Sequence, residues 1–501
     1  MMNISMLGIV RQKFAIVIFF LGILVSSFIG LLIGQGDSSA TSVLILFLMI
    51  FFIFALFLFG GSFTLILGML AWLPFQNGTI AMLSLANVLS PPISGLIVLM
   101  KEMLVLGILW LLILKGKVCH LLKVDRLFII YVIWVFLRLP FGNLNLLAKV
   151  AGIRMLIIPI LVYFLGRFLP IPSNGLERTW RIVFKTSLLI SAFGWIEYLF
   201  FSEFYMGQLQ HASVLAKGSS ISDIGLGGMF YTAINLGSLG GSVLWFRRMI
   251  STYLEPLGFG HALILIIVYL FYCFVEPRLK LINLRIKGNW SLIGIGLTQM
   301  MSLSRGAILA TLIGFGTILI MTRRVRLRSV LFFATILIIT KLVPFASRFV
   351  ANTINLKDPS SFYHVQQLDL GWRFLFLHPW GLGLGHGGYV EGQYSSDMSE
   401  GLGESFYFSM VSQVGIIGLG LFILSLLTLF INLYQCYKRQ QSELSKVTAL
   451  VSLSALVGYS IAAIASESAF GMLASAAVWF MVGMVIQMGA RVNLARPRSA
   501  D

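Results

Sequence analysis

The sequence FYFSMVSQVGIIGLGLFILSLLTLFINLY runs from Phe406 to Tyr434 without a charged side chain. A helix of about 20 apolar residues is long enough to cross the hydrocarbon core of a bilayer. Because this run exceeds that length, it predicts a membrane-spanning helix.

Similar apolar runs recur along the chain. Runs of spanning length lie near 14–33, 42–59, 92–114, 152–168, 184–203, 257–275, 305–322, 329–346, 406–434, 447–465 and 468–489, and shorter ones near 62–74, 127–138 and 289–303. Apolar residues make up 58% of the 501 positions and charged residues only 11%, too few to cover a soluble protein of this size. We therefore expect an all-α, polytopic transmembrane bundle of about 12 to 14 spanning helices.

The distribution of Lys and Arg predicts the orientation of the bundle. About two thirds of the 36 cations fall before residue 14, after residue 489, or in the loops 115–126, 167–185, 276–288, 323–328 and 436–446. These stretches all lie on one side if every segment crosses, and short cytoplasmic loops retain Lys and Arg. We expect a multi-pass protein of the plasma (inner) membrane with both termini in the cytoplasm. The net charge of +18 then needs no nucleic-acid partner.

The N-terminal segment and the cysteines fit this interpretation. The apolar run after Arg11 and Lys13 is longer than the apolar region of a secretory signal, so we expect a retained first helix. Cys119 and Cys436 lie in loops assigned to the cytoplasm, and Cys273 lies near the cytoplasmic end of its helix. Thiols stay reduced there, so no disulfide or metal framework is predicted.

The predicted organisation has four parts: N-terminal helices over 1–90, core helices over 91–346, a large outer loop over 347–404 and C-terminal helices over 405–501. The core includes a smaller, glycine-rich outer loop near 204–256. The large loop holds a third of the 18 acidic residues, and we predict no secondary structure for it. Long loops without such structure are usually functional.

Three arginines stand out on the predicted outer side, where cations are otherwise scarce. Arg154 begins a helix, Arg305 lies in an outer turn within Ser304-Arg305-Gly306-Ala307, and Arg373 lies in the large loop. A guanidinium presents a rigid fork of donors suited to phosphate oxygens, so a phosphorylated lipid head group is the simplest ligand. The alternative is that each arginine extends to the interface or pairs locally with an acid.

The large loop also carries a recognisable combination of motifs. Residues 372–385 read WRFLFLHPWGLGLG, and Glu404-Ser405 then leads into Gly-Ile-Ile-Gly at 415–418. This combination resembles the bacterial O-antigen ligase and O-antigen polymerase superfamily. The segment around Arg305 resembles the second arginine motif of that superfamily, and the run from Arg154 to Arg167 resembles the helix with its third arginine.

The resemblance implies a membrane glycosyltransferase without cofactor or metal. A donor glycan on undecaprenyl pyrophosphate is attacked by a hydroxyl of an acceptor sugar, and the lipid pyrophosphate leaves. Fixed cations stabilise the leaving group, and the hydroxyl needs a base. Arg154, Arg305 and Arg373 suit the first role. The implied partners are lipid-linked oligosaccharides, membrane lipids, a chain-length regulator and a flippase.

The position of the base follows from the resemblance as well. The ligases of the superfamily carry a histidine 11 residues before the first glycine of the Gly-Ile-Ile-Gly helix, and the same spacing here reaches Glu404. This difference favours a polymerase of oligosaccharide repeat units, forming O-antigen or exopolysaccharide, over an O-antigen ligase acting on a lipid A-core acceptor. The alternative role for Glu404 is to cap the helix that begins near Ser405.

Other ionisable residues leave alternatives open. His386 follows the glycine-rich residues 381–385, and it either contacts substrate or is a solvated loop residue. Lys101 and Glu102 interrupt an apolar helix, and they need not pair with each other because neighbouring helical side chains point in different directions. Glu197, inside another helix, is a candidate partner for Lys101. Arg247 and Arg248 are further candidates for contacts to phosphate or glycan.

The sequence also offers a dinucleotide site and a carrier function as alternatives. Residues 383–388 fit the glycine pattern of a dinucleotide site, but no strand-helix-strand unit surrounds them, so we reject that site. A carrier, such as a flippase of lipid-linked oligosaccharides, is the competing class of function. Carriers carry interrupted helices in both halves and charge near the membrane midplane, whereas these polar residues gather on one side.

The predicted orientation can be tested with an impermeant thiol reagent on intact cells. In a chain whose own cysteines have been replaced, a cysteine introduced at Ser395 should be labelled from outside, because residues 350–403 are assigned to the outer face. Cysteines placed in 115–126 or 276–287 should be protected. A protected residue 395 would contradict the assignment of the site to the outer side.

Overall fold

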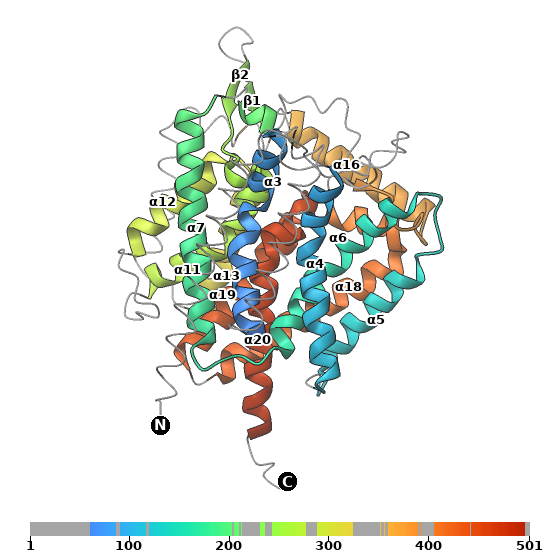
Figure 1. Cartoon of the computed structure of the whole chain (residues 1–501), viewed down its shortest axis with the longest axis vertical. Helices are drawn as coiled ribbons and strands as arrows, with labels where there is room; N and C mark the ends of the chain where they lie inside the picture. Colours follow the sequence, from blue (N-terminus) through green and yellow to red (C-terminus); the bar gives the residue numbers. More distant parts are fainter. Residues whose placement is uncertain are drawn as a thin grey trace, which may run out of the picture.

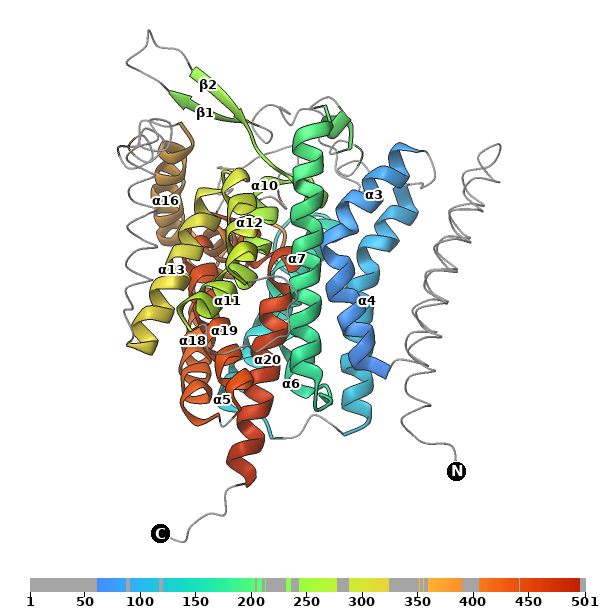
Figure 2. The same cartoon turned by 90° about the vertical axis from the view of Figure 1, so that its left-hand side faces the viewer.

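The computed structural model describes residues 61–86, 91–116, 120–202, 205–209, 243–276, 288–323, 359–388, 405–440 and 442–495, together with 212, 231–235, 351, 355 and 391. This part of the chain forms a bundle of helices. A short β-hairpin and helix α16 lie at one end of it, and the C-terminal end of helix α20 lies at the other (Figures 1 and 2). We call these the hairpin end and the opposite end.

The first part of the bundle leads up to the hairpin. It comprises a helix over Gly61–Leu85 that contains the 3₁₀ turn η1 (Leu73–Phe75) and ends as α3 (Gln76–Leu85), followed by α4 (Pro91–Leu114), α5 (Lys123–Leu137), α6 (Leu146–Phe168) and α7 (Gly175–Phe200).

The second part begins at the hairpin. It comprises β1 (Tyr231–Asn235), β2 (Val243–Arg247), η2 (Ser251–Tyr253), α10 (Pro256–Ala262), α11 (Ile264–Val275), α12 (Gly288–Met301), α13 (Arg305–Thr322), α16 (Pro359–Leu377), α18 (Phe406–Arg439), α19 (Glu443–Ala462), η3 (Glu467–Phe470) and α20 (Met472–Ala495).

The helices match the predicted apolar runs wherever the structure describes them. Among the described residues, nine helices are long and apolar enough to cross a membrane. α5 and α12 coincide with predicted short segments. The predicted segments 14–33, 42–59 and 329–346 lie outside the described residues. A helical, multi-pass membrane protein is therefore supported, and the number of spans stays a prediction.

Two features of the hairpin end differ from the expected fold. Strands β1 and β2 pair antiparallel, with Tyr231 opposite Arg247, within the loop near 204–256 of an expected all-α protein. Their sequences, YTAIN and VLWFR, are rich in residues that favour strands. The large loop, for which no secondary structure was predicted, contains α16. Phe374 and Leu375 of this helix are buried with Val411 of α18, and that packing accounts for a helix outside the apolar runs.

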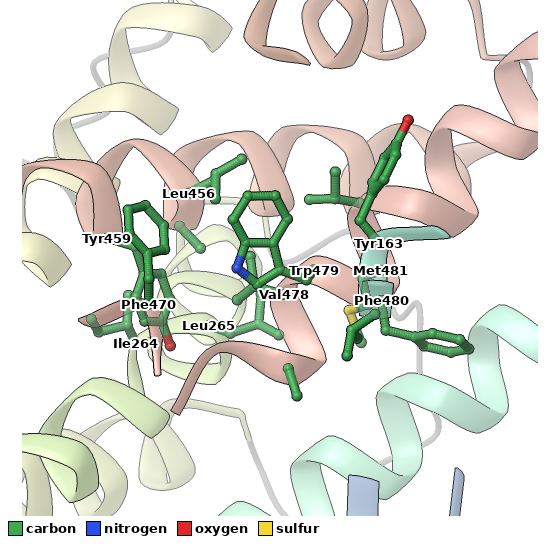
Figure 3. Packing of buried hydrophobic residues seen from close by; sticks show 14 of the residues in the cluster. Tyr163, Ile264, Leu265, Leu456, Tyr459, Phe470, Val478, Trp479, Phe480 and Met481 are labelled. Atoms are coloured by element: carbon green, nitrogen blue, oxygen red, sulfur yellow. The ribbon is translucent and has the colours of Figure 1, made fainter. Parts of the chain in front are cut away.

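The core of the bundle is built where helices approach closely. α6 and α20 meet at Gly166 and Gly483, where an added Cβ would collide with the facing backbone. Small residues allow such contact between membrane helices. Beside them, Trp479 is fully buried between the rings of Phe128 and Phe470, part of the cluster drawn in Figure 3. The core thus joins helices far apart in sequence.

Helix α18 is broken at Gly415, although its sequence reads as one apolar run. Gly415 has φ 71° and ψ −175°, a conformation that side chains with a Cβ rarely adopt. The Ile416 N–H donates to the Pro379 carbonyl at 2.8 Å instead of to its own helix, and the Leu382 N–H donates to the Ser412 carbonyl at 2.7 Å. One helical hydrogen bond is thereby replaced by two bonds to the segment 379–382.

Replacing Gly415 with Ala should destabilise the protein by at least about 1–3 kcal/mol, because a Cβ there is strained. It would also lie 2.6 Å from the Trp380 carbonyl carbon. Thermal unfolding of the protein in detergent measures the loss. Gly420→Ala is the matched control, since position 420 of the same helix has open space around it. Equal unfolding temperatures for the two variants would contradict the role of Gly415.

Candidate functional site

Two arginines lie close together at the hairpin end. Arg305 is the first residue of α13, and Arg248 follows β2 and donates from Nε to the Ser302 carbonyl at 3.0 Å. Burial and the nearby charge of Arg305 lower the pKa of the Arg248 guanidinium to about 10, an effect that Glu255 partly offsets. Two such cations beside the N-terminus of a helix form a positive site suited to an anion.

His261 of α10 lies next to this positive site. Its ring is fully buried, and Nδ1 lies 2.7 Å from the Leu257 carbonyl, so that nitrogen carries the proton. Nε2 is left as an acceptor and has no hydrogen-bond partner among the described residues. A Cβ added to Gly306 would lie 3.8 Å from Nε2, which places the imidazole against the first turn of α13.

The turn η3 connects His261 to the glycine-rich turn. Ser468 Oγ lies 3.3 Å from His261 Nδ1, and the adjacent Glu467 accepts a hydrogen bond of 2.8 Å from Ser409 Oγ on α18. A Cβ on Gly388 would collide with the Glu467 carboxylate. Polar groups therefore continue from Arg305 to the glycine-rich turn.

The glycine-rich turn spans residues 381–388 and presents His386. Nδ1 of His386 lies 3.3 Å from Oε1 of the buried Glu391, whose other oxygen accepts from the Gly387 N–H at 2.7 Å. Ser412 Oγ donates to the His386 carbonyl at 2.7 Å. A carboxylate that orients an imidazole in this way is an arrangement used for proton transfer. The expectation of a freely solvated His386 is wrong, because its side chain is only 15% exposed.

The turn is held by helices on both sides. Gly385 donates to Gln413 Oε1 of α18 at 3.2 Å, and its close approach to α6 leaves no room for a Cβ, which would lie 2.8 Å from the Ala148 carbonyl carbon. The element before the turn is helix α16 and not a strand. The rejected dinucleotide interpretation therefore has no support in the local fold.

The structure places Arg154 away from these groups. Gly152 faces Gly385, and residues two apart on a helix point to nearly opposite sides, so Arg154 faces α4. There its Nη2 lies 2.8 Å from Glu102 Oε1, and Lys101 Nζ lies 3.4 Å from the same oxygen. Lys101 and Glu102 therefore form an ion pair, which their adjacent positions in the helix did not by themselves predict.

Arg373 and Glu197 each form an ion pair with a different residue nearby. Arg373 is 72% exposed and pairs with Asp369 one turn earlier on α16. Glu197 pairs at 2.6 Å with Arg247, and its second oxygen accepts from the Ile250 and Ser251 N–H groups. Pairing of Glu197 with Lys101, considered from sequence, is therefore wrong.

Glu404 lies outside the described residues. Helix α18 has its cap without it, because Ser405 is the N-cap and its hydroxyl accepts from the Phe408 N–H. Among the described residues, no three His, Cys, Asp or Glu side chains gather as a metal site.

Sequence reasoning missed several of the groups that now lie together. His261 reads as an interior residue of an apolar run, and Glu467 as an isolated acid between two apolar helices. The signal for Glu467 was available, since it is an acid in a short loop on the same predicted side as the glycine-rich turn. The local sequence does not indicate that Arg248 and Arg305 lie close together.

No family model matches the chain, and no curated protein sequence matches it. The resemblance to the O-antigen ligase and polymerase superfamily therefore rests on its motifs.

Proposed function

We propose that this protein is a glycosyltransferase of the plasma membrane that polymerises oligosaccharide repeat units carried on undecaprenyl pyrophosphate. The main support for the proposal is that a cationic group of residues and an acidic group of residues are connected by contacts at the hairpin end. Arg248 and Arg305 lie on one side, and Glu467 and the His386–Glu391 pair lie on the other, connected through His261 and η3.

This arrangement meets the needs of glycosyl transfer. The acceptor hydroxyl oxygen forms a bond to the anomeric carbon of the donor while the bond from that carbon to the pyrophosphate oxygen breaks. The bonding electrons leave with the pyrophosphate, whose charge Arg248 and Arg305 stabilise, and the hydroxyl proton passes to a base. Glu404 is the proposed base from the motif spacing.

The other predicted arginines take secondary places in this proposal. Arg154 is committed to Glu102 and supports the packing of α6 on α4, and Arg373 contacts substrate only from the exposed face of α16. His386 contacts the acceptor sugar beside the glycine-rich turn. An O-antigen ligase would use the same chemistry with a different acceptor, and a flanking chain-length regulator and flippase would serve the polymerase.

One observation favours the carrier alternative. The ion cluster of Lys101, Glu102 and Arg154 lies in the interior of α4 and α6 and not at the helix ends. A flippase is expected to carry charge at such interior positions. The two functions differ in their products. An enzyme joins repeat units in detergent or in sealed vesicles alike, whereas a carrier only changes the leaflet in which a single unit resides.

Replacing Arg305 or Arg248 with Ala should reduce polymer formation by roughly 10²–10³-fold, as expected on removing a group that stabilises developing charge. Lys should restore little, because it cannot form a bidentate fork. Polymer length and amount on gels, normalised to protein in the membrane, measure the effect. Arg181→Ala is the control, since Arg181 is half exposed and pairs with Glu177 of its own helix. Full activity of Arg305→Ala would remove Arg305 from the site.

Replacing Glu404 with Gln should abolish polymer and cause single lipid-linked repeats to accumulate, because the amide keeps the size of the side chain but cannot accept the proton. Asp should retain partial activity. Ser405→Ala is the matched control for capping and should cost about 1 kcal/mol of stability with normal turnover per molecule. Normal turnover of Glu404→Gln would transfer the role of base to the His386–Glu391 pair or to Glu467.

A further inference from the structure

A groove of about 630 Å³ opens beside the break in α18. The start of the glycine-rich turn, Gly381 and Leu382, forms part of its lining. The groove lies between the end of α5 and the segment that follows α16. Its lining includes Trp134, Leu137, Arg138, Phe141, Trp380 and Leu382. Trp134 also donates to the Val414 carbonyl at 2.9 Å, so one wall of the groove is bonded to the break itself.

Arg138 gives the groove a positive charge. The residue is only 8% exposed, and its Nη2 donates to the Gly381 carbonyl at 3.3 Å. Its Nε has no hydrogen-bond partner, and no carboxylate pairs with it in the part of the chain that the structure describes. A buried cation is costly unless an anion accompanies it, so the groove favours an anionic occupant.

The walls around Arg138 are apolar and open to the surroundings. Leu137, Phe141 and Trp380 expose 58%, 53% and 62% of their surfaces, and the Phe141 ring lies 4.5 Å from the guanidinium. The groove lies at the end of α5, which coincides with a predicted short membrane segment. Trp is enriched where membrane segments reach the interface. An occupant must therefore combine an anionic head with hydrocarbon.

We propose that this groove binds the phosphate head group of a lipid, with Arg138 on the phosphate and Leu137, Phe141 and Trp380 along the first part of the hydrocarbon chain. A guanidinium fork suits phosphate oxygens, and aromatic side chains suit the boundary between head group and chain. The site is separate from Arg248 and Arg305, and it does not rest on the proposed enzymatic function. The phosphate belongs either to an acidic membrane phospholipid or to a polyprenyl phosphate.

Native mass spectrometry of the full-length protein in detergent tests the proposal, with phosphatidylglycerol, a polyprenyl phosphate and phosphatidylcholine added in turn. The two anionic lipids should be retained in preference to phosphatidylcholine, whose head group is neutral overall. The better retained of the two identifies the source of the phosphate. Equal retention of phosphatidylglycerol, polyprenyl phosphate and phosphatidylcholine would overturn the proposal, whether or not the protein makes polymer.

Variants locate the binding. Arg138→Gln should lower retention of the preferred lipid by about tenfold or more, because it removes a charge-assisted hydrogen bond. Arg138→Lys keeps the charge and should retain an intermediate amount, and it remains informative if the Gln variant does not fold. Arg126→Gln is the control, since Arg126 is exposed at the other end of α5. Unchanged retention in both Arg138 variants, or an equal loss in Arg126→Gln, would overturn the assignment.

Discussion

The exchange of hydrogen bonds at Gly415 is the constraint on which the hairpin end depends. Within a bilayer every backbone N–H and carbonyl needs a partner inside the protein, so a spanning helix is interrupted only where another segment supplies those partners. Segment 379–382 does this for Ile416 and Ser412. In doing so it fixes the start of the glycine-rich turn against α18, and through that turn it fixes His386 and one wall of the Arg138 groove.

The candidate functional site is built from short segments between the helices rather than from the spanning helices themselves. Residues after β2, the turn η3 and the glycine-rich turn supply Arg248, Glu467 and His386, while the helices supply their ends. Such segments carry free backbone groups, and here side chains satisfy several of them, as Glu391 does for Gly387. The result is a cationic region and an acidic region that share one end of the bundle.

The spanning helices could be predicted because length and hydropathy are local properties, as the runs 152–168 and 447–465 illustrate in α6 and α19. Helix α16 could not, because Asp369 and Arg373 interrupt its apolar pattern and its burial depends on α18. The break at Gly415 is equally hidden, since glycine is common in membrane helices and its φ angle is not written in the sequence. Partners such as Glu102 for Arg154, 52 positions apart, follow only from the packing.

The contact between Gly166 and Gly483 has a consequence for biogenesis. α6 enters the membrane long before α20 is made, and the two are also joined across 318 positions by the hydrogen bond from Gln487 to Leu169. At ribosomal rates of roughly 5–20 residues per second, that interval lasts on the order of 15–60 s. During this time the glycine face of α6 has no α20 to fill it. Assembly of the core is therefore post-insertional, and a ribosome that stalls before α20 leaves an open bundle.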